Sequence, residues 1–133
     1  MSKIKVVPCS GIGKVFGLMA RESALRVTDV LASDICETAC LAHIVSGDDE
    51  ARAKVEGLNC ISVDGCPALC AAKSIKASGG IVKAEFRVVD IMKEHRGKNA
   101  GDGTALSEEG WIITDDLADR IAAKAIEIAK EVE

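Results

Sequence analysis

The stretch that decides the fold is NCISVDGCPALCAAKSIKASGG, from Asn59 to Gly80. Its first part, NCISVDG, contains several β-branched residues and ends at Gly65, which is typical of a buried strand. Its second part, PALCAAKSIKAS, predicts a helix with Pro67 at the first position and two glycines after the end. A strand that turns directly into a helix is typical of a parallel β-α-β unit.

Segments on both sides continue this alternation of strands and helices. Further strands are predicted for KIKVVP (Lys3–Pro8) and for KAEFRVVD (Lys83–Asp90). For residues 35–39 a strand is favoured because it completes the β-α rhythm, and a continuous helix is the alternative. Further helices are predicted for VFGLMARESALRVTDVLA, for about Asp48 to Glu56 and for the tail from Thr114 to Glu133. We therefore predict a single α/β domain over residues 1–133, with a mainly parallel sheet of about four strands flanked by helices in Rossmann-like layers.

The helical period also predicts which side chains face the core. The helix after residue 14 places Val15, Leu18, Met19 and Leu25 on one face, and the tail places Leu117, Ile121, Ala125 and Ile128 on another. We expect Trp111 to pack the tail against the body. We expect residues 95–104 to form a Gly-rich surface loop.

Composition and charge exclude several functional classes. The 133 residues are 48% hydrophobic and 29% charged, an ordinary balance for a globular protein, and the net charge of -4 disfavours nucleic-acid binding. No segment has the length of a membrane span, and the N-terminal apolar run is too short for a secretion signal. We predict a cytoplasmic protein without a nucleic-acid or membrane partner; the oligomeric state is not visible in the sequence.

Six cysteines in a reducing compartment do not indicate a disulfide framework, so each is either a small buried residue or part of a metal or catalytic site. Ligands of parallel α/β sheets bind beyond the carboxyl ends of the strands. Cys9, Cys40 and Cys66 follow predicted strands, and Cys70 lies one turn into the predicted helix after Cys66. We expect them to cluster at that edge of the sheet.

Cys66 and Cys70 are four residues apart, which places two sulfurs on one helix face. A helix N-terminus favours the thiolate, the form that binds metals. Four thiolates suit a closed tetrahedral zinc site or an iron–sulfur cluster. We predict zinc, with a structural or sensing role and an iron–sulfur cluster as the alternative. The basic side chains of Lys14, Arg21 and Lys73 could offset the negative charge of the site.

Other uses of these residues stay open. All six cysteines could be core or surface residues, or Cys9 or Cys66 could be the nucleophile of a redox or sulfur-handling enzyme. Cys60 alternates with apolar residues and is predicted to be buried in the core, and Cys36 is not favoured as a ligand. Asp64 could support the site or cap the turn. No catalytic residue is assigned.

Three glycines, Gly11, Gly13 and Gly17, follow the first strand without completing a dinucleotide-binding fingerprint. We expect them to turn the loop around Cys9 and pack the helix, although their N–H groups could hold a small anion or a small-molecule ligand. His43 and His95 stand alone and are expected to be structural.

Three motifs, VPCSGIGK, the Cys40-Leu41 pair and VDGCPALCAAK, together resemble the DGC-domain family, named for its Asp-Gly-Cys motif. The resemblance runs from about Lys5 to Gly79, includes GKVFGLMAR, and becomes loose after Asp90. The family is described as zinc-binding because it carries four cysteines able to chelate. Carried over by position, the resemblance implies the same four ligands: Cys9, Cys40, Cys66 and Cys70. It implies a site and no particular reaction.

Overall fold

A computed structural model of the chain describes residues 3–8, 14–38, 56–65, 70–102 and 105–132. It contains one parallel sheet in the order β2-β1-β3-β4, with the strands β1 (Ile4–Pro8), β2 (Cys36–Thr38), β3 (Asn59–Asp64) and β4 (Ile81–Arg87). The helices are α1 (Val15–Arg26), its π-helical extension η1 (Val27–Leu31), α4 (Cys70–Ala77), α5 (Val88–Glu94) and α6 (Glu108–Val132). The predicted α/β class with a four-stranded parallel sheet is confirmed.

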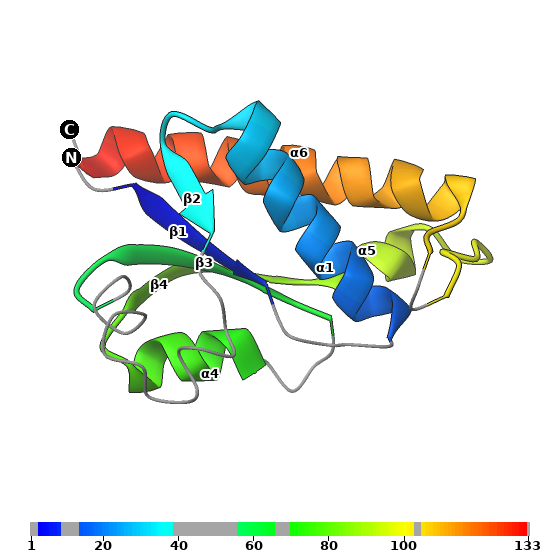
Figure 1. The fold of residues 1–133 in the computed structure, drawn as a ribbon, viewed down its shortest axis with the longest axis horizontal. Helices are drawn as coiled ribbons and strands as arrows, with labels where there is room; N and C mark the ends of the chain where they lie inside the picture. Colours follow the sequence, from blue (N-terminus) through cyan, green and yellow to red (C-terminus); the bar gives the residue numbers. More distant parts are fainter. Residues whose placement is uncertain (1–2, 9–13, 39–55, 66–69, 103–104, 133) are drawn as a thin grey trace.

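Helices cover both faces of the sheet. Helices α1 and α6 lie against one face, and α4 lies against the other (Figure 1). From the centre of the sheet, the chain moves outward to β2 after β1 and α1, and outward in the opposite direction to β4 after β3 and α4. The strand order therefore reverses between β1 and β3, and in such sheets the crevice at the carboxyl ends of these two strands is where ligands bind.

The main core lies between the sheet and the α1–α6 layer. The central strands β1 and β3 are almost wholly buried, whereas the residues of the edge strand β4 are at least partly exposed. The predicted inner face of the tail helix is confirmed, because Leu117, Ile121, Ala125 and Ile128 are all buried. This apolar stripe fixes α6 along the same face of the sheet as α1.

Two expectations about single side chains are wrong. Leu25 is 41% exposed because the buried side of α1 passes instead through Met19, Ala20 and Ala24. Trp111 is 44% exposed near the start of α6, where Ile113 takes the inward position.

The predicted strand Lys83–Asp90 is wrong beyond Arg87, and the strand also begins earlier, at Ile81. Val88 and Val89 suggest a strand by propensity, but Val88 and Ile91, the two buried residues of this segment, have the three-residue spacing of one helix face. The Nε and Nη2 atoms of Arg87 bind the carboxylate of Asp90 at 2.8 and 2.9 Å across the first turn of α5.

The tail helix starts at Glu108, six residues before its predicted start. Ser107 accepts a hydrogen bond from the N–H of Gly110 at 3.0 Å and so caps the helix. The Ser107 hydroxyl also donates to the carbonyl of Asn99 at 2.5 Å, which ties the Gly-rich segment to α6. A β-carbon at Gly110 would collide with the carbonyl of Ala100, so this close contact requires glycine.

Within the described ranges, no helix combines the length and the apolar character needed to cross a membrane. The predicted helix from about Asp48 falls, apart from Glu56, outside those ranges, as do His43, Gly11 and Gly13.

Candidate metal centre

Three of the predicted metal ligands follow the ends of three neighbouring strands. Each strand end and the cysteine after it are Pro8 and Cys9 for β1, Thr38 and Cys40 for β2, and Asp64 and Cys66 for β3. These three cysteines lie outside the described residues, whereas Cys70 is the first residue of α4. The described strand ends therefore define where each cysteine-bearing segment leaves the sheet.

The register of the sheet relates these positions to one another. Val6 pairs with Thr38 of β2 and with Ile61 of β3, so these three residues stand level across the sheet. Along the chain from that level, the predicted ligands follow after two residues for Cys40, three for Cys9 and five for Cys66. All three therefore follow the carboxyl ends of their strands, within a few residues of the level of Val6.

The spacing of the strands makes a meeting of these segments sterically feasible. Neighbouring strands lie about 4.8 Å apart, so Thr38 of β2 and Ile61 of β3, which stand level on either side of β1, are separated by about 10 Å, and β3 continues three residues beyond that level. Each additional residue extends the chain by up to about 3.3 Å. One or two residues beyond each strand, together with a cysteine side chain, can span the remaining distance.

Asp64, the aspartate of the Asp-Gly-Cys motif, joins the end of β3 to the start of α4. Its Oδ1 accepts a hydrogen bond from the N–H of Ala71 at 2.8 Å, and its Oδ2 accepts one from Ala72 at 3.4 Å. The side chain is fully buried. The six residues between Asp64 and Ala71, which include Cys66 and Cys70, are thus bounded by two residues in direct hydrogen-bond contact. Of the two roles predicted for Asp64, the capping role is confirmed.

Burial raises the pKa of Asp64 above its ordinary value, the hydrogen bonds from Ala71 and Ala72 oppose this shift, and the charge of Glu85 adds to it. The carboxylate also occupies the N–H groups of the two residues after Cys70. The N–H groups of Ala71 and Ala72 are therefore occupied by Asp64. They are not free to stabilise a cysteine thiolate, the role that the sequence analysis gave to the start of this helix.

Gly65 lets α1, on the face of the sheet opposite α4, approach the end of β3 closely. A β-carbon on Gly65 would lie 3.0 Å from the backbone nitrogen of Gly17 and 3.0 Å from the carbonyl carbon of Phe16. Gly65 does not have a positive φ, so glycine is needed here for the close approach of α1. The segment with Cys9 therefore leaves β1 beside Val63 and re-enters the described fold just before α1 meets Gly65.

The two other cysteines lie inside the sheet, away from this edge. Cys36 and Cys60 are the first residue of β2 and the second of β3, with exposed fractions of 1% and 0%. Burial raises the pKa of both thiols from 9.0 to about 11. The prediction that Cys60 is a buried core residue is confirmed.

Basic side chains stand near the starts of the two helices. Lys14 is the N-cap residue of α1, and Lys73 lies in the first turn of α4; both are exposed. Arg21 is half-buried in the middle of α1. None of the three forms an ion pair with another described residue. The two lysines can therefore offset negative charge at this end of the sheet.

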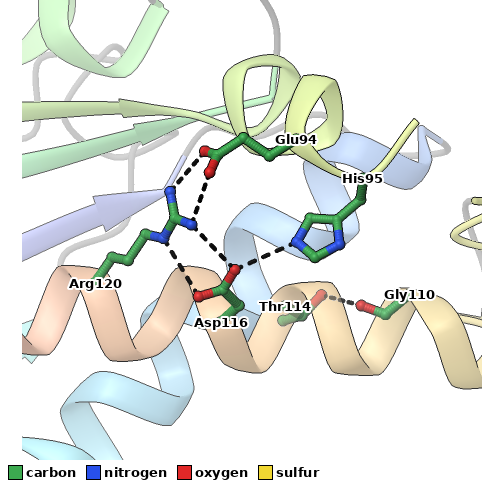
Figure 2. A network of polar contacts seen from close by, with 6 residues as sticks. All are labelled: Glu94, His95, Gly110, Thr114, Asp116 and Arg120. Carbon is green, nitrogen blue, oxygen red and sulfur yellow. Dashed lines mark hydrogen bonds and ion pairs between the residues drawn. The ribbon is translucent and has the colours of Figure 1, made fainter.

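A separate polar network connects α5 with α6 (Figure 2). Arg120 binds both carboxylate oxygens of Glu94 at 2.7 and 3.0 Å and also contacts Asp116, which lies 3.3 Å from Nε2 of His95. These contacts hold two helices together and confirm the structural role predicted for His95. The sequence analysis missed this network, although Asp116 and Arg120 have the i, i+4 spacing of a helical ion pair.

Within the part of the chain that the structure describes, no three His, Cys, Asp or Glu side chains gather as a metal site. A comparison with protein families gives one match: the model of the DGC domain matches residues 5–109. This match extends well past the Lys5–Gly79 span of the resemblance. Comparisons with curated proteins and with solved structures give no match.

Proposed function

Because the chain belongs to the DGC-domain family, we propose that it binds a zinc ion through the thiolates of Cys9, Cys40, Cys66 and Cys70. The observation that carries the proposal is the register of β1, β2 and β3. One cysteine follows the carboxyl end of each of these strands. The fourth proposed ligand, Cys70, is the first residue of the helix that is hydrogen-bonded to the end of β3.

The chemistry of the donors fits this metal. Thiolates are soft ligands that select zinc, Cu(I) and iron–sulfur clusters over magnesium or calcium. Four thiolates around Zn²⁺ carry a net charge of minus two. The helix starts bear the exposed amines of Lys14 and Lys73, which reduce the cost of gathering that charge.

A complete set of four thiolates leaves no open coordination position, which favours a structural or sensing role over catalysis. When bound, zinc would link the segments after β1, β2 and β3 to the start of α4. This crosslink would join β2, at the edge of the sheet, to the two central strands.

Elemental analysis of untagged protein tests the proposal. We expect about one zinc ion per chain in the wild type, and a loss of nearly all metal in each of the variants Cys9→Ser, Cys40→Ser, Cys66→Ser and Cys70→Ser. Cys36→Ala and Cys60→Ala are matched controls, because they remove buried thiols at other positions in the sheet. Full zinc content in any one of the four serine variants would remove that residue from the site.

The same samples separate the alternative uses of these thiols. An iron–sulfur protein would be coloured, with iron and sulfide in place of zinc. A redox pair would change the mass of the intact chain by two hydrogens on oxidation, whereas chelation removes zinc without changing that mass. Either result, with no zinc in the wild type, would replace the zinc assignment.

A further inference from the structure

The aspartate of the Asp-Gly-Cys motif is the described side chain most directly connected to the proposed site. We propose that Asp64 is a positioning residue for metal binding: its buried carboxylate, hydrogen-bonded to the first turn of α4, fixes the helix start at Cys70 relative to the end of β3. This inference rests on the proposed function.

The first step is the geometry of the hydrogen bonds. Both carboxylate oxygens are used, one for Ala71 and one for Ala72, which directly follow Cys70 in the chain. Two bonds to consecutive N–H groups fix both the distance and the direction of the helix start. A side chain with a single acceptor atom cannot offer a separate oxygen to each of these groups.

The second step is burial. Asp64 has an exposed fraction of 0%, and its strand neighbour Ser62 is also fully buried. Water competes poorly for a buried hydrogen bond, so the contact persists, and removing the carboxylate leaves two helix N–H groups without their partner. The end of β3 and the start of α4 are thus held together without any metal.

The third step is the position of Gly65. The residue after Asp64 packs against the backbone of Phe16 and Gly17, which fixes the β3 end of the turn against α1. Asp64 and Gly65 therefore attach β3 to the starts of two helices on opposite faces of the sheet. Residue 66, a proposed ligand, comes next in the chain.

Such a prearranged turn lowers the entropy that the protein loses when it binds a metal. Removing groups that orient metal ligands typically weakens metal affinity by about 10- to 100-fold. We therefore expect the zinc dissociation constant of Asp64→Ala to rise by about that factor. We expect Asp64→Asn, which keeps one acceptor oxygen, to fall between Asp64→Ala and the wild type.

The experiment measures zinc affinity by competition with a chromophoric chelator, and ligand geometry from the visible spectrum of the Co²⁺-loaded protein. Ser107→Ala is the matched control, because it removes the N-cap of α6, a helix with no proposed ligand. The proposal predicts weaker zinc binding and an altered cobalt spectrum for both Asp64 variants. It predicts that Ser107→Ala keeps the wild-type spectrum and a zinc affinity within about two-fold.

The outcomes separate this inference from the proposed function. If the wild type binds neither Zn²⁺ nor Co²⁺, the proposed function is overturned. If the wild type binds zinc and Asp64→Ala binds it equally well, or if Ser107→Ala weakens binding as much, only the positioning role is overturned. Should Asp64→Ala fail to fold, Asp64→Asn carries the same comparison, and amide exchange at Ala71 and Ala72 reports the loss of the contact directly.

Discussion

The six cysteines fall into two classes according to whether they lie within a strand or outside the strands. Cys36 and Cys60 lie within strands, and burial disfavours their charged forms, so both are small apolar side chains in this fold. The sulfur of Cys60 also contacts the carbonyl of Leu58 at 3.5 Å. The other four cysteines follow strand ends or open a helix, where a thiolate can meet a cation.

This division predicts a difference in thiol reactivity. With a pKa of about 11, Cys36 and Cys60 are thiolates at pH 8 in only about one molecule in a thousand, against about one in ten for a pKa of 9.0. After removal of metal, iodoacetamide at pH 8 should modify the other cysteines and spare these two until the protein is unfolded. Peptide mass spectrometry identifies the labelled residues. Rapid native labelling of Cys36 or Cys60 would contradict their assignment to the core.

The cysteines also show how far sequence reasoning reaches at this scale. Cys60 could be assigned to the core because it alternates with apolar strand residues. Asp64 was harder, because an aspartate after a strand suits either a turn cap or a partner of a metal ligand. The choice between these two roles of Asp64 depended on where the helix begins. The helix predicted to begin at Pro67 gave no indication that Ala71 and Ala72 would be the hydrogen-bond donors.

At the scale of elements, the close approach of α1 to the end of β3 depends on one missing methyl group. In Gly65→Ala, the new β-carbon would meet backbone atoms of Phe16 and Gly17 at 3.0 Å, and backbone cannot move away as a flexible side chain can. We expect the free energy of unfolding to fall by roughly 1 to 3 kcal/mol. Urea denaturation of the metal-free variant measures this change.

Gly57→Ala is a comparison variant in which the substitution strains the backbone without a steric overlap. No atom lies within 4 Å of a β-carbon at Gly57, but its φ of 72° strains an L-residue. Equal stability of Gly65→Ala and the wild type would show that α1 can move away from β3 at little cost.

Element types were easier to predict than their ends. Long apolar periods identified α1 and α6, and β-branched runs identified β1 and β3. The boundary between β4 and α5 was missed because Val88 and Val89 favour a strand locally, while tertiary burial of Val88 and Ile91 selects a helix. The early start of α6 had a readable signal in Ser107 followed by Glu108 and Glu109, a cap with acidic residues in the first turn.

At the scale of the whole molecule, the apolar core of the described residues contains none of the proposed metal ligands. Met19, Ile61 and Ile121, three of the largest buried side chains, belong to α1, β3 and α6, whereas the proposed ligands follow strand ends or open α4. The hydrogen bonds of Asp64 and the ion pairs of Arg120 likewise require no metal. The fold therefore has its own sources of stability, unlike a small zinc finger.

Metal removal is accordingly expected to weaken the protein without unfolding it. A ligand present at about 100 times its dissociation constant adds about 2.7 kcal/mol to stability, so chelation should lower the melting temperature measurably. The far-ultraviolet circular dichroism should keep its helical signal, because α6 is held by apolar packing. Thermal melts and spectra of wild type and Cys66→Ser, each with and without chelator, measure both effects. Complete unfolding by chelation would make the metal part of the folding nucleus, as in zinc fingers, and an equal shift in Cys66→Ser would show that the chelator acts elsewhere.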